Sequence, residues 1–228
     1  MKLRGSRGCP THCRGHICAA IAALTLGLGL ALTDISPAVA QQPSSETLVQ
    51  DLRKGGYVIV VRHMNTDPTQ ADTDTSHLEN CTAQRQLTQA GRDNAAAFGA
   101  ALRRLNIPVG QVMASAYCRA LDSARLAGFD KIAPSLDVAE PQNVPPVEGQ
   151  RRAAVLRKLV STPPAAGTDT VIITHRPNIL DAFGKDFFDV GEGEVVIFEP
   201  TAGTPGYRVL ARVAKPDMWT QWAQTLAR

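Results

Sequence analysis

The sequence predicts an α/β fold, a three-layer α/β/α sandwich around a mainly parallel sheet. Runs of β-branched and other apolar residues occur at 57–61, 109–115 and 170–174. The runs at 57–61 and 170–174 are continuous, which is typical of strands that are buried on both faces of a sheet, and 109–115 is a further short apolar strand. Segments with helical patterns separate these runs, and strands that alternate with helices form parallel sheets covered by helices on both sides.

The first forty residues differ in composition from the rest of the chain. Four basic residues precede an apolar run over 17–32, and the segment ends in Ala38-Val39-Ala40. A basic start, a short apolar core and a small-residue exit are the parts of a secretory signal peptide. The apolar run is shorter than the roughly twenty residues that span a bilayer. We therefore expect a signal peptide over 1–40, cleaved near Ala40 rather than kept as an anchor, and an exported protein that is periplasmic or secreted.

Charge and length restrict the class of protein that follows the leader. Four of the 24 Lys and Arg residues and one of the 21 Asp and Glu residues lie in the first forty positions, which leaves 20 of each in residues 41–228. A neutral chain has no global field to hold nucleic acid or an anionic membrane, so a local pocket must supply any affinity for anions. The remaining 188 residues are enough for one domain, which we place at 41–228.

Turn and capping residues divide this domain into elements. Gly55 and Gly56 end the first helix, and Thr88 can cap the helix that follows a long polar loop. Pro177 stands where a helix tolerates proline, in its first turn. The expected order is helix 47–54, strand 57–61, loop 64–85, helix 89–105, strand 109–115, helix 119–126, an irregular segment 134–146, helix 150–160, strand 170–174, helix 177–183, strands 194–198 and 207–213, and helix 218–226.

Residues suited to catalysis follow each of the three buried runs. Arg62 and His63 end the first, Arg119 follows the second at the start of a helix, and His175 follows the third. Ligands of open α/β sheets bind beyond the carboxyl ends of the strands. We therefore expect these four side chains to meet in one crevice.

These motifs resemble those of a known family. Val61-Arg62-His63, the segment 115–120 (Ser-Ala-Tyr-Cys-Arg-Ala) followed by Ser123-Ala124, and the segment 173–175 (Ile-Thr-His) resemble the Arg-His, second-arginine and second-histidine motifs of the histidine phosphatase, or phosphoglycerate-mutase-like, superfamily. The resemblance covers about 57–213 and implies a phosphoglycerate-mutase-like fold.

The resemblance also implies a chemistry. His63 would be the nucleophile that forms a phosphohistidine, Arg62 and Arg119 would bind the phosphate oxygens with their planar forks, and His175 would donate to the same group. It implies no cofactor, and the chain has no metal-ligand spacing such as C-x-x-C or H-E-x-x-H. We expect an exported, metal-independent phosphomonoester hydrolase that acts on a small phosphorylated substrate or a phosphorylated envelope component.

The chain departs from the family pattern near both histidines. Met64 stands where a small residue is usual, and we expect it to narrow the pocket or change the turn. Arg176 and Pro177 follow the second histidine, where one branch of the family has an aspartate as proton donor. The general acid would then come from Glu140 or Glu148, with Glu192 and Glu194 as further possibilities. Asn178 either lines the phosphate pocket or shapes the turn.

Two alternatives to a hydrolase are compatible with the sequence. A mutase must retain the phosphoryl group, and a non-enzymatic phosphate-binding or envelope-interaction protein is compatible with Met64 and the missing aspartate.

Cys81 and Cys118 are the cysteines left after leader removal. We predict a disulfide between them that pins the long loop to the pocket, the alternative being two buried free thiols.

Overall fold

The structure is a computed structural model in which residues 42–227 are described. The signal peptide expected over 1–40 and its cleavage near Ala40 lie outside the described residues. Among the helices of 42–227, none is both long and apolar enough to span a bilayer.

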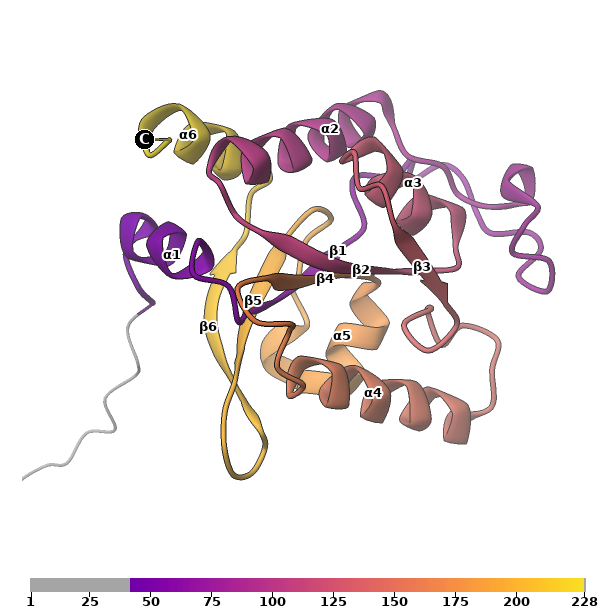
Figure 1. Cartoon of the computed structure of the whole chain (residues 1–228). Coiled ribbons are helices and arrows are strands. Elements are labelled where there is room, and N and C mark those ends of the chain that lie inside the picture. Colours follow the sequence, from indigo (N-terminus) through magenta and orange to yellow (C-terminus); the bar gives the residue numbers. More distant parts are fainter. Residues whose placement is uncertain (1–41, 228) are drawn as a thin grey trace, which may run out of the picture. The chain divides into compact units, whose positions relative to one another are not determined.

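Six strands form one sheet in the order β3-β2-β4-β1-β5-β6 (Figure 1). The four strands from β3 to β1 pair in parallel, and β5 and β6 add an antiparallel edge. The predicted mainly parallel sheet is therefore confirmed. The strand bounds are β1 Val58–Arg62, β2 Val109–Ser115, β3 Ile132–Ser135, β4 Asp169–Thr174, β5 Val195–Pro200 and β6 Tyr207–Val213.

Helices cover both faces of the sheet and confirm the predicted sandwich (Figure 1). One face is covered by α1 Ser45–Leu52, α2 Gln89–Arg104, α3 Cys118–Leu126 and α6 Asp217–Thr225. The other is covered by α4 Pro146–Val160 and α5 Arg176–Phe183, with the short 3-10 helix η2 Lys185–Phe187. A further 3-10 turn, η1 Cys81–Ala83, lies in the long loop after β1.

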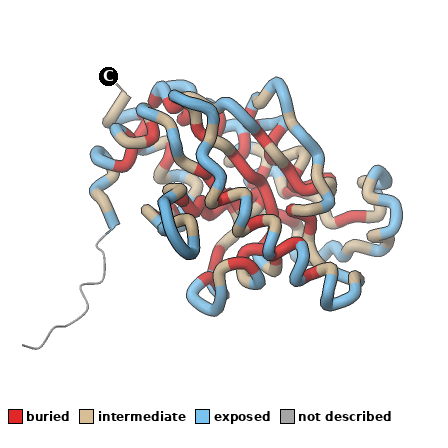
Figure 2. The backbone as a smooth tube through the Cα atoms, turned by 60° about the horizontal axis from the view of Figure 1, so that its bottom comes forward, coloured by how far each residue is buried: buried red, intermediate tan, exposed pale blue. Residues whose placement is uncertain are grey.

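Alternate residues of each central strand enter opposite cores. In β1, Ile59 and Val61 pack with the α2 side, whereas Val58 and Val60 pack with the α4 side, and all four are fully buried. Figure 2 shows buried residues concentrated along the central strands, while the connecting loops are largely exposed. This burial on both faces explains why residues 58–61 of β1 and 171–173 of β4 are continuously apolar.

The parallel pairing of β1 with β4 aligns the two histidine motifs. Arg62 pairs with Thr174, and the backbone N–H of His63 donates to the Thr174 carbonyl oxygen at 3.0 Å. His63 and His175 therefore leave the sheet at the same level. Because the register places them there, their proximity is a property of the sheet itself.

One expected irregular segment contains a strand. We expected 134–146 to be irregular, but β3 covers Ile132–Ser135 and pairs with β2, and α4 begins at Pro146 rather than Gln150. Pro134 obscured the strand in the sequence because proline is normally depleted within sheets. Its position is compatible with β3 being an edge strand, where one row of backbone groups has no partner strand.

Candidate active site

The two predicted catalytic histidines lie together at the carboxyl ends of β1 and β4. Both are 1% exposed, and their ring centroids are 5.1 Å apart. His63 Nδ1 lies 2.9 Å from the Met64 carbonyl oxygen, which can only accept. In the neutral ring this contact holds the proton on Nδ1 and leaves the Nε2 lone pair free, the form that a nucleophile needs.

Burial keeps both imidazoles neutral. Desolvation lowers the pKa of His63 well below its usual value, and the positive charge of Arg119 lowers it further. The pKa of His175 is also well below its usual value, first because of burial and then because of His63 and Arg119. His175 Nε2 lies 2.7 Å from the Ser115 hydroxyl, and the Tyr117 ring packs edge-on against it at 5.1 Å.

Arg119 is the most enclosed cation of the site. Its side chain is fully buried and stacks over the Tyr117 ring, 4.5 Å from the centroid. One guanidinium nitrogen donates to Asp72 Oδ1 at 3.0 Å and the other to Glu140 Oε2 at 2.5 Å. The planar fork that would match two phosphate oxygens is thus held by two carboxylates in this structure.

Arg62 lies beside Arg85, an arginine that the sequence motifs did not predict as part of the site. Arg62 donates to the Val190 carbonyl oxygen at 2.8 Å and to Glu192 Oε1 at 3.3 Å. Arg85, at the end of the long loop, places Nη2 3.8 Å from the same Glu192 oxygen, and its charge helps to lower the pKa of both His63 and His175. Its position at the end of the loop that follows the first predicted strand is the sequence feature that could have indicated Arg85. No motif in the sequence marked it.

Several buried polar atoms of this cluster have no hydrogen-bond partner in the described part of the chain. They are Nε of each of the three arginines and Nδ1 of His175. Buried polar groups without a partner are rare in native structures, and they are informative where they gather. Four such atoms therefore lie in one cluster with hydrogen-bonding capacity to spare.

The structure separates the candidates for the general acid. Glu140 contacts Arg119 and lies 3.5 Å from His175 Nδ1, measured from Oε2. Glu148 instead accepts from Arg151 and Arg152, and these hydrogen bonds lower its pKa to about 2. Glu194 accepts from Arg212 at 2.6 Å, and Glu192 pairs with Arg62. Of these glutamates, Glu140 alone contacts both the second arginine and the second histidine.

Asn178, in the first turn of α5, is fully buried and lies next to the segment that carries Glu140. Its amide donates to the Ala139 carbonyl oxygen at 3.2 Å, while Arg152 donates to the Glu140 carbonyl oxygen at 3.0 Å. Both contacts fix the backbone around Glu140. The phosphate-binding role of Asn178 stays a prediction.

A disulfide joins Cys81 to Cys118, with their Cα atoms 5.6 Å apart. The backbone N–H of Cys118 donates to Gln84 Oε1 at 2.9 Å, and that of Arg85 donates to Asp72 Oδ1 at 2.9 Å. The long loop is thus attached at the residue that directly precedes Arg119.

Two other residues near the first histidine lie away from the phosphate cluster. Met64 packs into the core on the α2 side, and its backbone N–H donates to the Ser123 hydroxyl at 3.0 Å. Its side chain therefore does not narrow the pocket as we expected. His77 has a side chain that is 68% exposed and pairs with Asp74, which is consistent with a residue outside catalysis.

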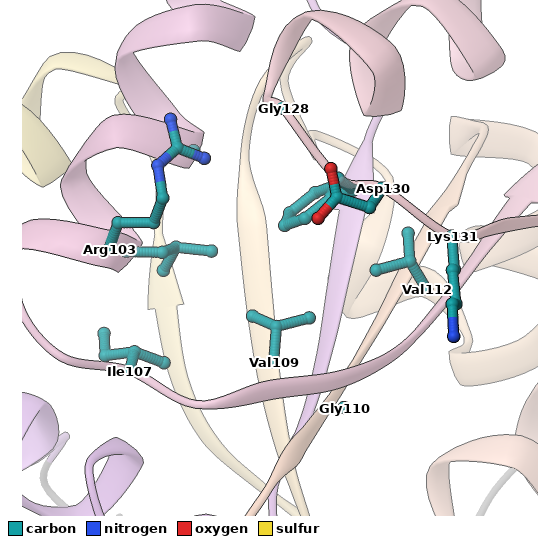
Figure 3. Close-up of a pocket in the computed structure, with 11 residues that line it drawn as sticks. Arg103, Ile107, Val109, Gly110, Val112, Gly128, Asp130 and Lys131 are labelled. Atoms are coloured by element: carbon teal, nitrogen blue, oxygen red, sulfur yellow. The ribbon is translucent and has the colours of Figure 1, made fainter.

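One surface cavity lies beside this cluster, and another lies at the opposite end of the strands. A cavity of about 380 Å³ is lined in part by Tyr117 and Glu140. Another, of about 340 Å³, lies at the amino ends of β2 and β3, where Arg103, Val109 and Lys131 surround it (Figure 3). The four predicted catalytic residues are absent from its lining. Within residues 42–227, no group of three or more His, Cys, Asp or Glu side chains is arranged to hold a metal ion.

Comparisons with known proteins give a fold. No protein-family model and no curated relative matches the chain. A candidate alpha-ribazole-5'-P phosphatase from Escherichia coli K-12 has a similar structure, with a TM-score of 0.51 and 12% identity over 71% of this chain and 98% of that one. The protein histidine phosphatase SixA complexed with tungstate matches at a TM-score of 0.46 and 14% identity, over 70% of this chain and 97% of that one. A phosphoserine phosphatase mutant from Entamoeba histolytica in complex with phosphoserine matches at a TM-score of 0.49 and 13% identity, over 70% of this chain and 97% of that one.

These structures are members of the histidine phosphatase superfamily. The resemblance stated from the sequence motifs is thus confirmed at the level of the fold, which is phosphoglycerate-mutase-like.

Proposed function

We propose that the protein is a phosphomonoester hydrolase that acts through a phosphohistidine at His63. The observation that carries this proposal is the cluster itself. Two neutral buried imidazoles converge with Arg62, Arg85 and Arg119, whose Nε atoms are buried without partners. A transferring phosphoryl group spreads negative charge over its oxygens, so positioned cations and donors are what its transition state requires.

The first half of the reaction transfers the phosphoryl group to the enzyme. His63 Nε2 attacks phosphorus while the Met64 carbonyl holds the Nδ1 proton, and the bond from phosphorus to the ester oxygen breaks. The arginines and His175 bind the phosphoryl oxygens. Glu140 gives its proton to the departing oxygen, so that the product leaves as an alcohol.

The second half returns the enzyme to its starting state. Glu140 takes a proton from water as the water oxygen attacks phosphorus, and the bond from nitrogen to phosphorus breaks, which releases inorganic phosphate. For the first step Glu140 must be protonated. When a phosphate occupies the Arg119 fork, Glu140 no longer pairs with Arg119 and can turn to the oxygen that leaves.

We further propose that the substrate is a small phosphorylated molecule or a phosphorylated envelope component, met after export. The leader pattern of residues 1–40 supports export, and a protein that keeps two cysteines close to one site is suited to an oxidising compartment. N-terminal sequencing of the protein recovered outside the cytoplasm tests this. A chain beginning at Gln41 is expected, whereas a full-length chain retained inside the cell would contradict export.

Labelling that is stopped with an alkaline quench tests the phosphohistidine. Brief incubation with a ³²P-labelled phosphate ester should give a label that is stable to base, labile to acid and located on the peptide with His63. His63→Ala should carry no label, and His77→Ala, in which an exposed histidine is removed, should be labelled like the wild type. A label on serine or aspartate would contradict the mechanism.

A phosphate-binding protein without turnover is the second candidate function. It is favoured by one observation, namely that Glu140, the proposed general acid, accepts from Arg119 in this structure. Titration with inorganic phosphate, followed by a turnover assay with p-nitrophenyl phosphate, separates the two functions. Binding with no turnover over many hours would support the second. A mutase would instead transfer the label to a second hydroxyl of the substrate.

A further inference from the structure

The cavity beside the candidate active site has walls from three parts of the chain. The long loop forms one wall, Ala116 and Tyr117 form the second, and the segment between β3 and α4 forms the third together with Arg152 of α4. Asn143 Nδ2 donates to Thr75 Oγ1 at 3.3 Å and joins the first wall to the third. The lining consists of Thr75, Ser76, Leu78, Glu79, Ala116, Tyr117, Leu136, Glu140, Gln142, Val144 and Arg152.

Glu140 connects this cavity to the phosphate cluster. Its carboxylate binds Arg119 and lies near His175, and it also lines the cavity. In the proposed reaction Glu140 protonates the oxygen that leaves. A group attached to that oxygen must therefore begin at Glu140, and the volume of about 380 Å³ beside it is the space open to this group.

The charges in the lining favour one sign of ligand. Glu79 and Glu140 contribute two carboxylates, and Arg152 contributes a guanidinium. The donors of Arg152 are already engaged, since it donates to Glu148 Oε1 at 2.8 Å and to backbone carbonyl oxygens. Glu140 pairs with Arg119 and carries a proton in the proposed reaction, so Glu79 is the carboxylate that faces the far end of the leaving group. A second anionic group on the substrate would be repelled by Glu79, whereas an ammonium group would face complementary charge.

We propose that this cavity is a leaving-group subsite that selects phosphate esters of amino alcohols over esters whose leaving group carries a carboxylate. The proposal rests on the proposed function, because it concerns the group that departs from the phosphate. The apolar side chains of Leu78, Leu136 and Val144 would pack against the carbon skeleton of such a group. Glu79, on the exposed wall, is the residue that would sense its charge without taking part in the chemistry.

Three two-carbon esters test the selection because they differ mainly in charge. They are 2-aminoethyl phosphate, 2-hydroxyethyl phosphate and phosphoglycolate. We expect kcat/KM to fall in that order, by about fivefold at each step, which is the factor that one unit charge about 4 Å away supplies in water. p-Nitrophenyl phosphate serves as the reference for turnover.

Charge reversal at the cavity wall sharpens the test. In Glu79→Lys the ratio of kcat/KM for 2-aminoethyl phosphate to that for phosphoglycolate should fall by at least about tenfold, while the value for 2-hydroxyethyl phosphate stays within about twofold. Glu46→Lys makes the same change of charge on α1, an exposed position outside the cavity lining, and should leave the ratio as it is. Circular dichroism confirms that both variants are folded, and Glu79→Gln should give an intermediate ratio.

The outcomes distinguish the two proposals. Turnover of p-nitrophenyl phosphate with equal rates for the three esters, or equal shifts in the two lysine variants, would overturn the subsite while leaving the hydrolase in place. No turnover of any of the four esters would overturn both.

Discussion

The two ends of the central strands treat buried charge in different ways. At the carboxyl ends, Arg119 lies between Asp72 and Glu140, and the two histidines beside it are neutral. At the amino end of β4, Asp169 is also fully buried, but it accepts a single hydrogen bond, from the Tyr57 N–H at 2.9 Å. Its second carboxylate oxygen has no partner within the described chain.

This difference shows what a site for anions requires. Burial raises the pKa of Asp169 to about 7, because no cation compensates the loss of water. At the other end the three arginines are paired with the carboxylates of Asp72, Glu140 and Glu192, and in the proposed reaction a phosphate would take the place of a carboxylate as the partner of an arginine. The carboxyl ends of the strands hold paired charges, whereas the amino end of β4 carries the isolated carboxyl of Asp169, whose burial costs stability.

The largest expected effect comes from removing a cation at the carboxyl end. Arg119→Ala should lower kcat by about 10² to 10³, the usual cost of losing one positioned electrostatic donor. Arg103→Ala, at the pocket of Figure 3, should keep near-normal kcat because its charge faces the other end. Steady-state kinetics with p-nitrophenyl phosphate decide the matter. Equal losses in both variants would mean that Arg119 acts through folding alone.

Removal of the disulfide should weaken the carboxyl end by a smaller amount. Replacement of Cys81 and Cys118 by serine opens a loop with a sequence separation of 37, for which the chain-entropy model gives about 3 to 4 kcal/mol of unfolding free energy. The kcat/KM should also fall, because the loop carries Asp72 and Arg85 into the site. Urea unfolding measures the first effect. Thiol titration of the non-reduced chain that begins at Gln41 should find no free thiol, and two would contradict the bridge.

The fold followed from the sequence because the buried strands have a strong and simple signature. The runs at 57–61, 109–115 and 170–174 all became strands, each within one residue of its expected bounds. The short strand β3 was missed because four residues that include Pro134 give no such pattern. Short edge strands are held by pairing with a neighbour, and a neighbour is not visible in local sequence.

The candidate site was predictable only in part, for a similar reason. The four residues at strand ends were found because strand ends are marked by the chain itself. Arg85 and Asp72 come from a loop whose path depends on the disulfide and on hydrogen bonds between distant residues. Asp169 was missed as well, because its isolation depends on what surrounds it in three dimensions.

The isolated carboxyl at the amino end should make stability depend on pH. The pKa of Asp169 is about 7 when folded and 3.8 when unperturbed, so the folded state binds the proton more tightly. Its contribution is therefore fully present below about pH 4 and is lost as the pH rises to about 7. Asp169→Asn removes this loss, so the variant should gain about 1 to 2 kcal/mol relative to wild type between pH 4 and pH 8, after allowance for solvent screening.

Thermal unfolding at the two pH values measures this gain, which corresponds to about 2 to 4 °C in Tm for each kcal/mol in a domain of this size. Asp130→Asn, an exposed acid at the same end, is the control and should show no such dependence. A difference between Asp169→Asn and wild type that does not change with pH would show that the carboxyl stays ionised when buried.

The smallest expected effect tests the exchange of partners at Arg119. Asp72→Asn keeps an oxygen for the Arg85 N–H but removes one negative charge from the Arg119 fork. Inorganic phosphate should then inhibit with an affinity about fivefold higher. Asp74→Asn, on the exposed part of the same loop, should leave the inhibition constant unchanged. Weaker inhibition in Asp72→Asn would mean that Asp72 helps to hold phosphate rather than competing with it.

Because β1 pairs with β4 at the centre of the sheet, the strand end that carries His63 and the loop that carries Asp72 should move on different timescales. Because the His63 amide donates to Thr174 within the innermost strand pair, that amide should exchange with solvent deuterium only when the whole domain unfolds. The loop that carries Asp72 is held by far fewer buried contacts, and its amides should exchange through local opening. In the proposed reaction the imidazole pair should therefore keep its place while the carboxylates of Asp72 and Glu140 change partners around it.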